Sequence, residues 1–103
     1  MKEDITVACF LTDNELRIRR QEHLDRMAAL LIEVTEIPTG FKYTFKLESN
    51  SLEQLTTIIE LERNCCPFLN FDLSIRAGEG TASLALTGPE GTKEAVKSLF
   101  NWN

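Results

Sequence analysis

Apolar and polar residues follow one another along this chain with the periods of strands and helices. Residues 5–11 alternate and are rich in β-branched side chains, which predicts a first strand with Cys9 facing the core. Apolar residues then recur three and four apart over about residues 13–31, which predicts a long helix. Residues 41–47 alternate again, and we expect residues 34–37 to pair with them as a short hairpin.

The beginnings and ends of two helices carry local signals. Residues 12–15 and 51–54 match the capping box, in which a hydroxyl accepts a hydrogen bond from a backbone amide at the start of a helix. The second helix should end at Cys65 or Cys66. Pro67 follows, and a proline lacks an amide hydrogen and disfavours helical geometry in the residue before it.

The last third of the chain predicts a hairpin and a final helix. Residues 69–76 alternate between apolar and polar side chains, and residues 81–86 read as the returning strand. Pro89 is expected at the first position of the last helix, a position that proline favours. We expect Trp102 to pack against the sheet or against a neighbouring chain.

The predicted order is therefore strand, helix, hairpin, helix, hairpin, helix. Each strand has one polar face, so we expect an antiparallel sheet with three helices packed on its other face, an α+β two-layer sandwich. The length of 103 residues, with 43% hydrophobic residues, fits a single domain over residues 1–103.

Composition narrows the classes of function. The formal net charge of −5 argues against nonspecific nucleic-acid binding, which needs a basic surface. The sequence predicts no signal peptide and no membrane span, so we expect a cytoplasmic protein. In that reducing compartment the three cysteines would be thiols, ligands or reactive groups rather than a disulfide framework.

Cys65 and Cys66 are the clearest candidates for chemistry. Adjacent cysteines are poorly placed for an ordinary disulfide, because the ring between neighbours strains the intervening peptide. Deprotonated sulfur is, however, the preferred ligand of thiophilic metals. The two residues point about 100° apart on a continuous helix, so unwinding before Pro67 would be needed to turn both sulfurs to one ligand.

Counting chain reversals places Cys9 at the same end of the fold as Cys65 and Cys66. Three thiolates would suit mercury(II), arsenite or another soft ion. A tetrahedral zinc site would need a fourth ligand from His23, a water molecule or a second chain. Packing in the core is the alternative explanation for each of these cysteines, since cysteine is often buried.

Arg20 and Glu62 each interrupt the apolar stripe of a predicted helix. Because the two helices should lie side by side, we expect the opposite charges to pair directly beneath the thiols. In the alternative, each side chain bends out to solvent separately.

The run from Glu62 to Phe71, together with segments 9–12 and 86–89, resembles a group of small bacterial proteins and appended domains with a Glu-x-x-Cys-Cys-Pro-Phe motif. Some of these are similar to segments found beside mercury-responsive and other heavy-metal regulators. The resemblance implies thiol-based handling of heavy metals. The matching positions are Cys9, Glu62, Cys65, Cys66 and Pro67.

Three functions follow from these patterns. The first is a module, not an enzyme, that binds a soft metal or metalloid. The second is a structural or interaction domain with packed thiols. The third is a thiol redox or transfer enzyme, which is disfavoured because the dipole at a helix C-terminus opposes thiolate formation. Sheet edges and the apolar residues 100–102 also predict a homodimer.

Overall fold

The computed structural model describes residues 14–103, and within them the chain forms three helices and a four-stranded antiparallel sheet. The elements are α1 (Asn14–Ala28), β1 (Leu31–Ile37), β2 (Gly40–Lys46), α2 (Ser51–Cys65), β3 (Asn70–Ile75), β4 (Thr81–Thr87) and α3 (Thr92–Leu99). The strand predicted over residues 5–11, with Cys9, lies outside the described residues, as does Thr12 of the first predicted capping box.

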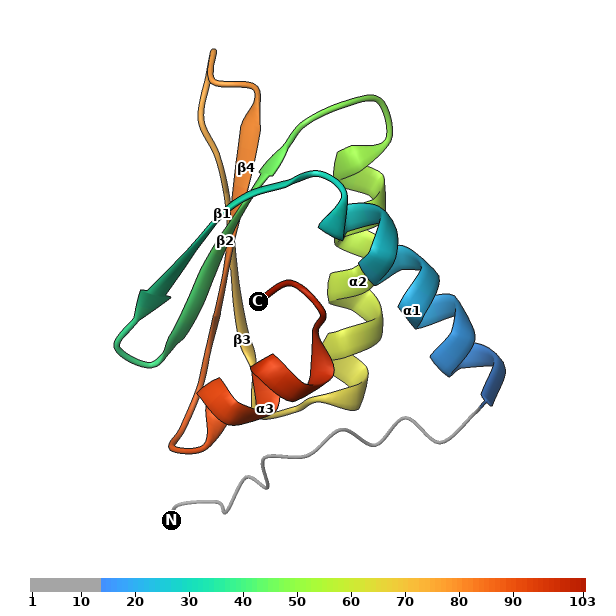
Figure 1. The fold of residues 1–103 in the computed structure, drawn as a ribbon, viewed down its shortest axis with the longest axis vertical. Helices are drawn as coiled ribbons and strands as arrows, with labels where there is room; N and C mark the ends of the chain where they lie inside the picture. The colour runs from blue at the N-terminus through green and yellow to red at the C-terminus, as the bar shows by residue number, and fades with distance from the viewer. Residues whose placement is uncertain (1–13) are drawn as a thin grey trace.

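The fold is α+β, as predicted. The strands are ordered β1-β2-β4-β3, and every neighbouring pair is antiparallel. Figure 1 shows the three helices on one side of this sheet, with α1 and α2 running in opposite directions. As a consequence, α1 begins at the same end of the helix layer at which α2 ends (Figure 1).

The two central strands supply most of the sheet's contribution to the core. Phe41, Tyr43 and Phe45 of β2 are buried, and each lies opposite a buried residue of β4. The register pairs Phe41 with Leu86, Tyr43 with Leu84 and Phe45 with Ala82. Paired residues of antiparallel strands share a face, so these six side chains form the surface on which the helices pack.

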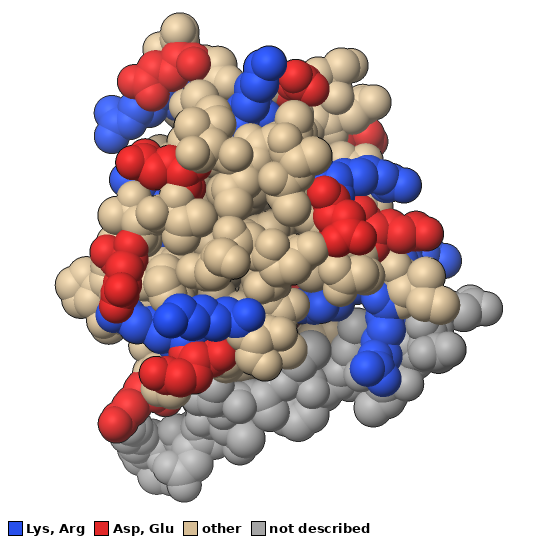
Figure 2. Space-filling model, in the orientation of Figure 1, with Lys and Arg blue, Asp and Glu red and all other residues tan. Residues whose placement is uncertain are grey.

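The C-terminal segment closes the gap between sheet and helices. Trp102 is 3% exposed, and its ring centroid lies 5.1 Å from that of Tyr43 and 4.9 Å from that of Phe45. Its indole N–H donates to the carbonyl oxygen of Leu24 at 3.1 Å, which ties the tail to α1. In the view of Figure 2, uncharged residues occupy the middle of the visible surface and charged residues lie around them. Trp102 therefore packs against the sheet of its own chain, the first of the two placements expected.

The first described helix is shorter than predicted, and the following strand is longer. α1 ends at Ala28 rather than near Leu31, and β1 begins at Leu31. Pairing with β2 decides the difference, because the β-branched residues Ile32 and Val34 suit a strand better than a helix.

The predicted capping box at Ser51 is wrong. Asn50 precedes the helix with a left-handed φ of 73°, and no side chain caps α2. The Ser51 hydroxyl oxygen instead accepts from the backbone N–H of Glu48 at 2.6 Å. Gln54, the other expected member of the box, binds His23 through its side chain.

The last helix also begins later than predicted. Pro89 lies in the turn before α3, and the helix starts at Thr92 after Gly91, which has a φ of 95°. The turn is tight at Gly88, where an added Cβ would lie 2.8 Å from the carbonyl oxygen of Phe68. The left-handed residue and the close approach, which only glycines tolerate, override the preference of proline for the first helical position.

Candidate functional site

The site begins where α2 ends. Cys65 is the last helical residue, and Cys66 leaves helical geometry with φ −123° and ψ 76°. The backbone N–H of Cys66 still donates to the carbonyl oxygen of Glu62 at 2.6 Å. Pro67 cannot donate the next hydrogen bond, so the predicted end of the helix is confirmed.

Both cysteine side chains are turned into the protein at this point. Cys66 is 0% exposed and Cys65 is 7% exposed, and both belong to the hydrophobic core. On a continuous helix, neighbours point about 100° apart and would rarely be equally buried. The departure of Cys66 from helical geometry thus allows both cysteines to be buried, and it is the unwinding before Pro67 that we expected as the condition.

A buried ion pair lies directly beneath Cys66. The Arg20 Nε–H of α1 donates to Glu62 Oε2 of α2, and Glu62 is 0% exposed. The Arg20 Nη2 donates to the carbonyl oxygen of Leu99, the last residue of α3, at 2.7 Å. The guanidinium also lies over the Phe100 ring, 5.3 Å from its centroid. The predicted pairing is confirmed, and the alternative of two separately solvated side chains is wrong.

The second oxygen of the same carboxylate faces a thiol. Cys66 Sγ lies 3.5 Å from Glu62 Oε1, at the distance of a hydrogen bond donated by sulfur. Arg20, Glu62 and Cys66 therefore form one connected polar network inside the core. Because Arg20 and Glu62 bind each other, neither side chain is an isolated buried charge.

His23 lies far from the thiols. Its Nδ1 is 2.7 Å from Oε1 of Gln54, near the N-terminal end of α2. Gln54 and Cys65 are separated by 65 − 54 = 11 residues of helix, which at 1.5 Å per residue is about 16 Å. Of the three sources considered for a fourth zinc ligand, His23 is therefore not placed to supply it within one chain.

The third sequence-predicted ligand, Cys9, lies outside the described residues. The structure does show the directions in which the helices α1 and α2 run. α1 begins at the end of the helix layer where Cys65 and Cys66 lie, as the count of chain reversals required (Figure 1). Within residues 14–103, no group of three or more His, Cys, Asp or Glu side chains is arranged to hold a metal ion.

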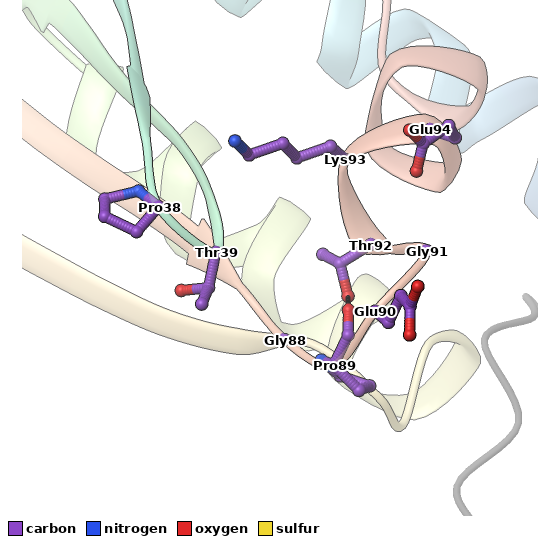
Figure 3. A pocket seen from close by; sticks show the side chains of 9 residues that line it. All are labelled: Pro38, Thr39, Gly88, Pro89, Glu90, Gly91, Thr92, Lys93 and Glu94. Atoms are coloured by element: carbon purple, nitrogen blue, oxygen red, sulfur yellow. Dashed lines mark hydrogen bonds between the residues drawn. The ribbon is translucent and has the colours of Figure 1, made fainter.

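A hollow of about 250 Å³ lies elsewhere, between the β1–β2 turn and the start of α3 (Figure 3). Pro38 and Thr39 line one side of it, and residues 88–94 line the other. The Thr92 hydroxyl donates to the carbonyl oxygen of Pro89 at 2.6 Å, so this buried side chain holds the turn together. Neither cysteine of the pair lines this hollow.

Comparisons with known proteins identified no relative of this chain. A scan against protein-family models and searches of curated proteins and of solved structures all found no match. In the part of the chain that the structure describes, no helix is both long and apolar enough to cross a membrane.

Proposed function

We propose that this chain binds a soft metal or metalloid ion through the Cys65–Cys66 pair. The observation that carries the proposal is the contact of Cys66 Sγ with Glu62 Oε1 at 3.5 Å, at a helix end where both thiols are enclosed. The thiol of Cys66 contacts a carboxylate, the neighbouring Cys65 is also buried, and sulfur is the donor that soft ions prefer.

The residues around the pair fit the proton chemistry of binding. A thiol must lose its proton to become a ligand, so binding releases protons. Glu62 Oε1 lies at hydrogen-bond distance from Cys66 Sγ, and Arg20 binds the other carboxylate oxygen, so the carboxylate holds the thiol in place. The negative end of the α2 dipole opposes a thiolate, and the positive charge of Arg20 offsets that effect. Arg20 and Glu62 thus support the ligands and do not bind the ion themselves.

The soft ions considered differ in the number of ligands that they bind. Mercury(II) is satisfied by two thiolates, and the described residues supply two. Arsenite binds three, so it requires Cys9 as the third ligand. Zinc prefers four ligands, and with His23 held by Gln54 the remaining ones would come from water or a second chain. We therefore take mercury(II) as the primary ligand, bound in the cytoplasm, where thiols stay reduced.

Mercury(II) titration of the reduced protein tests this proposal. The ultraviolet charge-transfer band of the mercury–thiolate bond, read against a competing small thiol, gives affinity and stoichiometry. The wild-type chain should bind about one equivalent. Cys65→Ser/Cys66→Ser should lose the band, whereas the matched control Cys9→Ser should keep it and lose only arsenite binding. Unchanged mercury affinity in the folded double variant would refute the proposal.

A second function has an observation of its own. Cys65 and Cys66 both belong to the buried core, which is what a structural or interaction domain with packed thiols would show. In that case Cys65→Ala/Cys66→Ala would lower the free energy of unfolding, and the wild type would bind mercury(II) no better than a small thiol does. The mercury(II) affinity of the wild type separates the two functions, because a loss of stability in Cys65→Ala/Cys66→Ala is expected under both.

A further inference from the structure

The two edges of the sheet are built differently. Within residues 14–103, β1 and β3 are the edge strands, and an edge exposes backbone groups that can pair with another strand. The pairing of β1 is interrupted by a register shift between Leu31 and Glu33, and the strand carries Glu33 and Glu36 and is followed by Pro38. Bulges, charges and proline are the usual means of protecting an edge from association.

The β3 edge has neither a bulge nor a proline, and Asp72 is the only charged residue in the strand. Its six residues pair with β4 in an unbroken register, and the strand contains no proline and no lysine. Leu73 is 37% exposed and Ile75 is 50% exposed. They lie opposite Leu84 and Ala82, which are buried, so both belong to the face that the helices cover elsewhere. The result is an apolar, regular strand edge at the margin of the core.

The sequence of β3, together with Arg76, which directly follows the strand, is complementary to itself. If two copies run antiparallel with Ser74 opposite Ser74, then Leu73 faces Ile75 of the second copy. In the same register Asp72 faces Arg76 of the second copy, on the outer face of the sheet. The two-fold axis generates each pair twice, so every apolar side chain meets an apolar one and every charge meets its opposite. Neither Asp72 nor Arg76 has an ion-pair partner among the described residues.

We propose that β3 pairs with β3 of a second copy, so that the sheet continues across a homodimer. Pairing of β3 with residues 5–11 of the same chain is the competing outcome, and protection of the outward β3 amides in the monomer would reveal it. The proposal does not depend on metal binding, because it uses no residue of the thiol site.

Charge exchange across the axis tests the interface and its register. The full chain, kept reduced, is measured by sedimentation over a wide concentration range. Asp72→Arg and Arg76→Asp should each raise the dimer dissociation constant at least tenfold, because each places like charges opposite one another. The double variant Asp72→Arg/Arg76→Asp restores opposite charges and should return to within about threefold of wild type.

Apolar variants on the two edges provide the matched control. Ile75→Lys should weaken the dimer at least tenfold, whereas Ile32→Lys on β1, where Ile32 is 58% exposed, should not. Hydrogen exchange of the β3 amides that point away from β4 should slow as the dimer forms. A monomer at all concentrations would overturn the proposal, and so would outward β3 amides that are already protected in the monomer. A dimer that Ile32→Lys breaks and the β3 variants leave intact would overturn it as well.

Discussion

Removing one member of the Arg20–Glu62 pair should cost far more stability than removing both. In Arg20→Met the carboxylate of Glu62, which is 0% exposed, would stay buried without its partner. Breaking a buried pair in this way typically costs about 3–5 kcal/mol. For a domain of this size, a loss of about 3 kcal/mol lowers the melting temperature by roughly 12–24 °C. Glu62→Gln should cost about 3 kcal/mol, since it leaves the guanidinium with only the Leu99 carbonyl and the Phe100 ring.

Urea unfolding of a double-mutant cycle measures the coupling. Arg20→Met/Glu62→Leu replaces the pair by apolar side chains, and such replacements are often neutral or stabilising. We therefore expect the double variant to be more stable than the single variants Arg20→Met and Glu62→Leu, with a coupling of at least about 2 kcal/mol. Arg63 and Glu60 provide the control, because their 3.2 Å ion pair on the same helix is exposed and should be worth less than about 1 kcal/mol. Additive losses in the Arg20–Glu62 cycle would refute the buried network and, with it, the electrostatic support assigned to the thiols.

Two further predictions concern the C-terminal tail and the residue it covers. Trp102→Ala should lower the free energy of unfolding by about 3–5 kcal/mol, because it empties a site between α1 and the sheet; a loss below about 1 kcal/mol in urea unfolding would show that the tail does not contribute to the core. Burial raises the pKa of Tyr43 above its ordinary value, and the hydrogen bond that its hydroxyl donates to Asn103 lowers the pKa only in part. The folded protein then keeps this proton where the unfolded chain loses it, so the contribution of Tyr43 to stability should be constant up to about pH 10 and be lost as the pH rises further. Tyr43→Phe should remove that fall, and because Tyr43 is the only tyrosine, its alkaline absorbance change reports the titration directly.

The sequence predicted correctly those elements in which the spacing of apolar residues fits only a helix or only a strand, or in which a local signal marks the end. The alternation of residues 41–47 corresponds to β2, and Pro67 placed the end of α2 correctly at Cys65. The boundary between α1 and β1 was wrong because the spacing of apolar residues near Leu31 fits both periods. The choice between a longer helix and an earlier start of the strand is decided only in the folded chain, where β1 pairs with β2.

Part of the site could be predicted from the types of residues in the sequence. A charge on each of two apolar stripes indicated that Arg20 and Glu62 would meet, since a lone buried charge is costly. The carbonyl oxygen of Leu99 could not be predicted, because a backbone acceptor leaves no mark in the sequence. The role of Gln54 was missed for a related reason: the capping-box pattern explained it locally, whereas in the folded chain it binds His23.

The position of Arg20 explains why residues next to the thiols also stabilise the fold. Its guanidinium binds Glu62 in the last turn of α2 and the final carbonyl of α3, so it lies where two helices end. The C-terminal end of each helix carries a partial negative charge, and two such ends together favour a cation strongly. Lysine could not replace it, because the contacts use two different nitrogens and the flat face of the group over Phe100. The cation that joins the three helices is therefore also linked to the thiol of Cys66 through Glu62.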